Sequence, residues 1–66
     1  MTNNLKVQRA IKDISQEELA RQIGVSRQTI NAMEKAKYVP STVLSLKIAR
    51  FFDVRVEDIF TLEDTD

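Results

Sequence analysis

Apolar residues recur at intervals of three and four along most of the chain, a spacing that places them on one face of an α-helix. Short polar stretches interrupt this pattern and divide the chain into five predicted helices. These are residues 4–12, 16–23, 27–35, 42–52 and 56–60. The acidic tail, residues 61–66, is expected either to fray or to pair in part as a strand with the N-terminus. The predicted fold class is all-α, with five helices and a small terminal β pairing as an addition.

Residues that cap helices stand at the expected boundaries. Ser15, Ser26 and Ser41 each precede a helix, where a serine hydroxyl accepts a backbone N–H of the first turn. Glu18 follows Ser15 by three positions, a spacing that predicts a reciprocal capping box. Gly24 is expected to end the second helix because glycine adopts a positive φ without strain.

The composition excludes several classes of site. The 66 residues include no cysteine and no histidine, which removes disulfides, zinc fingers and catalysis by imidazole. We therefore expect no metal and no cofactor, and no small-molecule ligand is indicated. A single domain of this length has a limited core, so helix packing helped by dimerisation is expected to stabilise it. Without a membrane span of roughly 20 apolar residues or a secretory signal, a cytoplasmic protein with no membrane partner is predicted.

Charges of opposite sign are segregated along the chain, although the formal net charge is zero. Residues 1–50 hold nine basic and four acidic side chains, a balance of +5. Residues 51–66 hold one basic and six acidic side chains, a balance of −5. Such a basic body can bind phosphates with one face while the acidic end stays away from them.

Residues 16–35 carry the functional prediction. Ala20 is small where two packed helices would touch, and Gly24 supplies a left-handed turn between them. Apolar side chains also occupy the buried positions of a helix-turn-helix, namely Leu19, Ile23, Val25, Ile30 and Met33. Together these residues predict a helix-turn-helix, the alternative being a helical hairpin without a role in DNA binding.

In this motif the first turns of the second helix enter the major groove of DNA. The side chains predicted to face outward there, and to contact bases, are Arg27, Gln28, Asn31 and Ala32. Arginine can pair with guanine, glutamine with adenine, and alanine can touch a thymine methyl group. A purely phosphate contact for Arg27 and a solvated side chain for Asn31 are the alternatives.

Polar residues around the recognition helix are predicted to contact phosphates, which fixes the register on DNA without reading its sequence. Gln16 begins its helix, where free backbone N–H groups also favour an anion. The predicted phosphate contacts are Gln16, Thr29, Lys35, Lys37, Tyr38, Ser41 and Thr42. Packing within the loop is an equally good interpretation of Tyr38.

Four stretches of the chain match the pattern of a known family: residues 15–20, residues 24–30, Glu34 and residues 40–41. In them the chain resembles the Cro/C1-type (Xre) family of bacterial and phage regulators, over residues 4–60. It is most similar to the short stand-alone members, which lack a sensor domain. The resemblance implies five helices, a dimer and operator binding.

The resemblance also implies roles for individual residues. It supports Arg27, Gln28 and Ala32 as base contacts, and it implies an ion pair between Arg9 and Glu34 that links the first helix to the third. Two unrelated surface charges are the alternative for that pair.

Two positions depart from the family pattern. Glycine or asparagine is usual at Ala36, and alanine at positive φ costs about 1–2 kcal/mol. The third helix is therefore expected to run on or to end differently. Glycine is common at Asp53, although aspartate tolerates the same conformation.

Apolar residues in excess of a small core predict a two-fold dimer through the end of the fourth helix, the fifth helix and the tail. The predicted interface residues are Leu44, Phe51, Val54, Val56, Phe60 and Leu62. The dimer would place two recognition helices about 34 Å apart on a palindromic operator. The predicted function is a sequence-specific transcriptional regulator that represses by covering a promoter.

The sequence leaves two alternatives to this function to be considered. An antitoxin that binds both DNA and a protein partner has the same fold, and the apolar tail would be its partner site. An enzyme is not expected, because the neighbouring carboxylates at Glu17/Glu18 and Glu57/Asp58 do not face each other on a helix. The chain also has no nucleophile–base pair and no phosphate-binding glycine loop.

Overall fold

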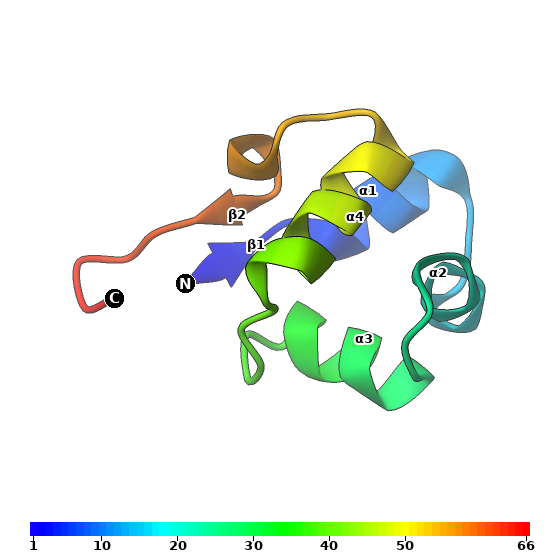
Figure 1. The fold of residues 1–66 in the computed structure, drawn as a ribbon, viewed down its shortest axis with the longest axis horizontal. Coiled ribbons are helices and arrows are strands. Elements are labelled where there is room, and N and C mark those ends of the chain that lie inside the picture. The colour runs from blue at the N-terminus through cyan, green and yellow to red at the C-terminus, as the bar shows by residue number, and fades with distance from the viewer.

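Four α-helices, one turn of 3-10 helix and two short strands make up the computed structural model, which describes residues 1–66 (Figure 1). In chain order the elements are β1 (Thr2–Asn3), α1 (Leu5–Lys12), α2 (Gln16–Ile23), α3 (Arg27–Glu34), α4 (Thr42–Phe52), η1 (Val56–Asp58) and β2 (Phe60–Thr61). The prediction of five helices is wrong, because the fifth segment is a 3-10 turn of three residues. Ile59 and Phe60 enter the core directly after it, and the backbone extends into β2.

Serine residues cap three of the helices as predicted. The hydroxyl groups of Ser15, Ser26 and Ser41 accept backbone N–H groups three residues ahead, at 3.0, 3.1 and 3.1 Å. The predicted capping box at Glu18 does not form. Its carboxylate instead accepts hydrogen bonds from the exposed Arg21, at 2.6 Å, and from Gln22.

A residue in the left-handed conformation ends α1, α2 and α4, and another lies in the loop that follows α3. Gly24 has a φ of 78° and ends α2, and Asp53 has a φ of 56° and ends α4, both as predicted. Asp13 does the same after α1, which the sequence did not indicate. Ala36 has a φ of 58° and α3 ends at Glu34, so the expectation that alanine at this position would make α3 run on or end differently is wrong.

Replacing Ala36 with glycine is expected to raise the free energy of unfolding by about 1 kcal/mol, because glycine relieves the steric cost of a left-handed residue. Urea unfolding followed by circular dichroism measures the change. The matched control is Ala10→Gly on the exposed face of α1, which should lower stability by about 0.5–1 kcal/mol. A loss of stability in Ala36→Gly would contradict this interpretation.

The core lies where the four helices and the start of β2 meet. Leu44, Ile48 and Phe52 are four residues apart, so they share the inward face of α4. Leu46, an apolar residue between Leu44 and Ile48, lies on the opposite face and is exposed. The buried apolar residues are Leu5, Leu19, Ala20, Ile23, Ile30, Met33, Leu44, Ile48, Ala49, Phe52, Ile59 and Phe60.

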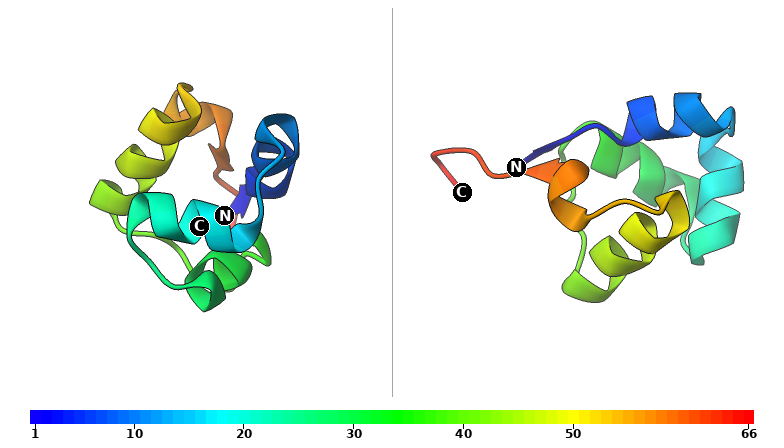
Figure 2. Two further views of the ribbon diagram at one scale, coloured as in Figure 1. Left: turned by 90° about the vertical axis from the view of Figure 1, so that its right-hand side faces the viewer. Right: turned by 90° about the horizontal axis from the view of Figure 1, so that it is seen from above.

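The chain termini are joined by an antiparallel pair of strands, which confirms the predicted terminal β pairing. Thr2 lies opposite Thr61, and Asn3 lies opposite Phe60. The amino group of Met1 forms ion pairs with Glu63 and Asp66 at 2.8 and 2.7 Å. Strands and tail project from the helical body (Figure 2), so the acidic end lies away from α2. None of the helices has the length and apolar character needed to cross a bilayer.

Candidate nucleic-acid interface

The predicted helix-turn-helix is present as α2, a tight turn and α3. Gly24 and Val25 both donate their backbone N–H groups to the carbonyl of Ala20, at 2.9 and 3.0 Å, which turns the chain at the end of α2. Ser26 then caps α3. Ala20 is buried, as a small residue at the contact between α2 and α3 should be. The two helices are thus held in a fixed relative orientation that leaves one side of α3 free.

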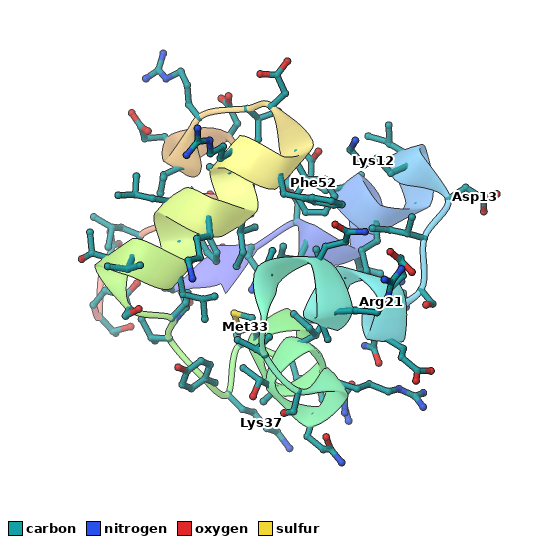
Figure 3. The ribbon with its side chains drawn as sticks, turned by 45° about the vertical axis from the view of Figure 1, so that its right-hand side comes forward. Lys12, Asp13, Arg21, Met33, Lys37 and Phe52 are labelled. Atoms are coloured by element: carbon teal, nitrogen blue, oxygen red, sulfur yellow. The ribbon has the colours of Figure 1, made fainter.

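The outward side of α3 is polar. Arg27 and Gln28 are exposed in its first turn, and neither side chain has a hydrogen-bond or ion-pair partner among the contacts of the described chain. Asn31 and Ala32 follow on the next turn and are half-buried. The helix is fixed from within by the fully buried Ile30 and Met33, as shown for Met33 in Figure 3.

A shallow hollow of about 320 Å³ lies between the start of α2 and α3. It is lined by Gln16, Arg27, Gln28 and Asn31, and no hydrophobic side chain contributes to it. The structure thus brings together three of the four predicted base contacts and one predicted phosphate contact. Amide and guanidinium groups at one surface can donate and accept hydrogen bonds in the pattern that base edges require.

A partly buried ion pair supports this surface from behind, which confirms the predicted pairing. Arg9 donates from Nε and Nη2 to the two carboxylate oxygens of Glu34, at 2.5 and 2.9 Å. Arg9 also donates to the carbonyl of Ile14. Gln16 Nε2 donates to Glu34 Oε1 at 3.1 Å and to Asn31 Oδ1 at 3.4 Å. These bonds tie α1, α2 and α3 together immediately behind the hollow.

The sequence did not predict the two bonds made by Gln16. The one available signal was that Asn31 and Glu34 are three residues apart, which puts them on the same face of α3. Which glutamine would meet that face depended on the angle between α2 and α3, which spacing alone does not define.

Electrostatics favour the ionised form of Glu34. Burial of this carboxyl acts to raise its pKa, but hydrogen bonds from Arg9 and Gln16 oppose burial, and the net effect is a pKa below the ordinary value of a glutamate. The hydrogen bonds to Glu34 likewise raise the pKa of Arg9. The pair is therefore charged at neutral pH.

Acid is expected to weaken the fold through Glu34. Because the folded pKa is depressed, the ionised carboxylate adds stability that is present above its unfolded pKa of about 4.3 and is lost as pH falls through the folded value. The free energy of unfolding in urea should therefore fall below about pH 4.3. A variant with both Arg9→Met and Glu34→Leu should lose less stability over that range, and an equal loss would contradict the role given to Glu34.

The predicted phosphate contacts surround α3 at various degrees of exposure. Two lysines, Lys35 and Lys37, are exposed and form no ion pair, and Thr42 is also exposed. Lys37 extends away from the body beside α3 (Figure 3). The hydroxyl of Thr29 is hydrogen-bonded to Ser26 at 2.9 Å. Two further candidates, Tyr38 and Ser41, are exposed on the loop to α4.

The predicted dimer residues divide into two groups. Leu44 and Phe60 are each 8% exposed and belong to the core of one subunit, so they have little surface to offer a partner. They are buried because Leu44 lies on the face of α4 shared with Ile48, and because β2 turns Phe60 inward. Val54 and Val56 are half-buried, and Leu62 is 78% exposed.

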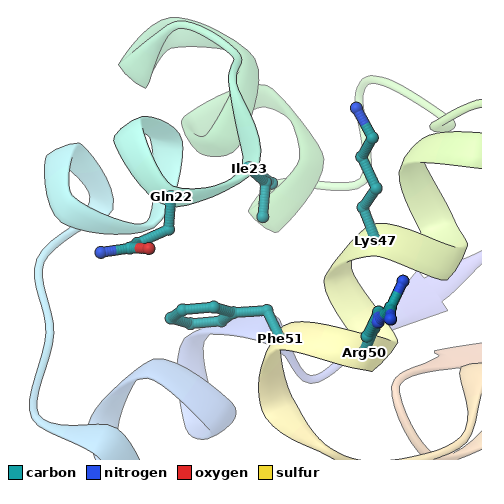
Figure 4. Close-up of a pocket in the computed structure, with 5 residues that line it drawn as sticks. All are labelled: Gln22, Ile23, Lys47, Arg50 and Phe51. Atoms are coloured by element: carbon teal, nitrogen blue, oxygen red, sulfur yellow. The ribbon is translucent and has the colours of Figure 1, made fainter.

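Phe51 is turned toward α2 rather than toward the tail. Its ring lines a second hollow, together with Gln22 and Ile23 of α2 and Lys47 and Arg50 of α4 (Figure 4). The ammonium group of Lys12 lies 5.1 Å from the ring centroid, a cation–π distance. Part of this side chain is thus engaged within the subunit.

A capped, polar recognition helix set on a tight glycine turn defines a helix-turn-helix DNA-binding protein. A family model described as helix-turn-helix matches residues 5–59, and the chain belongs to this Cro/C1-type family. The resemblance deduced from the sequence is thereby confirmed.

Relatives in several prokaryotes belong to the same class of protein, and one solved structure has a similar fold. An HTH-type transcriptional regulator of Methanocaldococcus jannaschii is 56% identical over 66 residues, covering 100% of both chains. The regulator YgzD of Bacillus subtilis is 48% identical over 64 residues, or 97% of each chain. The crystal structure of the restriction-modification controller protein C.AhdI from Aeromonas hydrophila matches with a TM-score of 0.76 and 32% identity, over 85% of this chain and 81% of that one.

The family and these relatives define the chain as a helix-turn-helix transcriptional regulator. They are regulators that bind DNA rather than enzymes, which confirms that no enzymatic activity is to be expected.

Proposed function

We propose that residues 1–66 act as one domain that binds double-stranded DNA sequence-specifically, with α3 in the major groove. The observation that carries the proposal is the pair of exposed, unpartnered side chains in the first turn of α3. Arg27 and Gln28 have the hydrogen-bonding groups that pair with guanine and adenine. Asn31 and Ala32 lie one turn further along the same helix and complete the proposed base contacts.

Phosphates are proposed to bind on both sides of α3. Lys35 and Lys37 supply positive charge at its C-terminal end, and the exposed hydroxyl-bearing residues of the following loop and α4 add hydrogen bonds. The proposed set keeps Gln16, Thr29, Lys35, Lys37, Tyr38, Ser41 and Thr42. Gln16 has its N–H groups engaged with Glu34 and Asn31, so a phosphate near it would be held by the N-terminus of α2 instead.

A homodimer on a palindromic operator is the proposed assembly. Val43 and Leu46 are one turn apart on the outer face of α4 and are 63% and 57% exposed, and Leu62 is also exposed. These exposed apolar side chains support pairing of two subunits, to which Val54 and Val56 would add. Leu44 and Phe60 are not included in the proposed interface, because both are buried within one subunit.

Repression by covering a promoter is the proposed mechanism, acting in the cytoplasm where the chromosome is accessible. The likeness to a restriction-modification controller supports a regulatory role on DNA. DNase footprinting combined with transcription in vitro tests it. Protection of two symmetric half-sites over a promoter, with loss of its transcript, is expected. Stimulated transcription from the bound promoter would contradict repression, and protection of one half-site would contradict the dimer.

A further inference from the structure

The hydrogen bonds behind the recognition surface converge on Glu34 and continue from Gln16 to Asn31. Arg9 donates to Glu34, and Gln16 then donates through the same nitrogen to Glu34 and to Asn31. Asn31 is the end of this series and lines the hollow beside Arg27. Each hydrogen bond thus limits which polar atoms of the next side chain remain free to bind DNA.

Glu34 determines which way the side-chain amide of Gln16 is turned. An ionised carboxylate accepts hydrogen bonds and cannot donate them, and the side chain of Glu34 is only 7% exposed. Gln16 must therefore turn its NH2 group toward Glu34, because the opposite orientation would place two oxygens against each other. The second N–H of that group meets Asn31 Oδ1 at 3.4 Å, so this oxygen, although it has two lone pairs, is turned toward Gln16.

The free group of Asn31 is then its NH2, a donor. Asparagine pairs with adenine through two bonds and needs both its donor and its acceptor for this. Guanine presents two acceptors in the major groove and thymine presents one. Asn31 held in this way can satisfy guanine or thymine, but it must give up the bond from Gln16 to turn both of its groups toward adenine.

Building on the proposed function, we propose that Asn31 reads DNA as a donor only and selects guanine or thymine over adenine. Glu34 is a positioning residue that imposes this selectivity through Gln16. The specificity of the recognition helix is then set in part by a buried carboxylate that never touches DNA.

Hydrogen exchange of side-chain amides in the DNA-free protein tests the first half of the proposal by NMR. The NH2 group of Gln16 should exchange roughly twofold to tenfold more slowly than that of Gln28, the range expected for the loss of hydrogen bonds of ordinary net strength. Gln28 is the matched control because it lies nearby, is exposed and has no partner. Equal exchange rates at Gln16 and Gln28 would overturn the proposal.

Selection of bound duplexes from random DNA tests the second half. Asn31→Ala identifies the base position, because the preference there should be lost. The wild type should disfavour adenine at that position by roughly tenfold, about the lower end of a good base contact. Gln16→Met keeps the side-chain length and the Arg9–Glu34 pair but frees Asn31 Oδ1, so adenine should become accepted.

An unchanged preference in Gln16→Met, or adenine selected by the wild type, would overturn the proposal. Failure of the wild type to enrich any sequence would instead contradict the proposed function. The exchange rates in the free protein would then still decide whether the side-chain amide of Gln16 is held in one orientation.

Discussion

The Glu34→Ala variant is expected to lose about 3–5 kcal/mol of unfolding free energy, because a buried cation is left without its partner. Only 14% of the Arg9 side chain is exposed, so water replaces only in part the two bonds that it donates to Glu34. A domain of this size has roughly 3–5 kcal/mol of net stability. Most of the variant chain should therefore be unfolded at room temperature, which circular dichroism and a urea titration measure.

Two variants control for this effect. Glu57→Gln removes an ion pair with Arg55 in which both side chains are at least 70% exposed, and it should change stability by less than about 1 kcal/mol. The double variant Arg9→Met with Glu34→Leu removes both buried charges and should recover most of the stability. A Glu34→Ala protein as stable as Glu57→Gln would show that the ion pair does not hold α1 against α3.

Replacing Arg27 or Gln28 with alanine is expected to remove discrimination between an operator and a scrambled duplex, by about 1–3 kcal/mol for each base contact. That is roughly a tenfold to hundredfold weaker specific binding. Both side chains are exposed and unpartnered, so their loss should leave the fold intact. Fluorescence anisotropy with both duplexes over a series of salt concentrations measures affinity and its salt dependence.

Lys37→Ala is the matched control because Lys37 is exposed near the same helix and is proposed to meet phosphate. It should weaken binding to both duplexes alike and reduce the slope of log affinity against log salt by about one. Equal losses on both duplexes in the Gln28→Ala variant would refute base reading by Gln28.

The local features of the fold were predictable because each depends on a few neighbouring residues. Serine hydroxyls cap helices wherever the chain enters one, and glycine at position 24 adopts its left-handed turn without regard to distant contacts. The terminal strand pairing and the Arg9–Glu34 pair were also anticipated, the second only through resemblance to a family.

Features that depend on packing were not predictable. Leu46 stands between Leu44 and Ile48 in an apolar run, and only the rotation of α4 against α2 shows that Leu46 faces outward. Ala36 adopts a left-handed backbone against its local preference, and the N–H groups of Ala36 and Lys37 close the end of α3 on the carbonyls of Met33 and Ala32.

The recognition surface was predicted in its residues but not in its bonding. Exposure of Arg27 and Gln28 follows from their place in the motif. The bond between Gln16 and Glu34 joins residues 18 positions apart, and it depends on how α2 packs on α3. Hydrogen-bond direction therefore had to come from the structure.

The central claim, that the first turns of α3 read base edges, is tested most directly by selecting bound duplexes from random DNA with the wild-type protein. The enriched sequences should contain two inverted half-sites centred about one helical turn, 10 base pairs, apart. Recovery of duplexes with no common sequence, at salt concentrations where the protein still binds DNA, would contradict the claim.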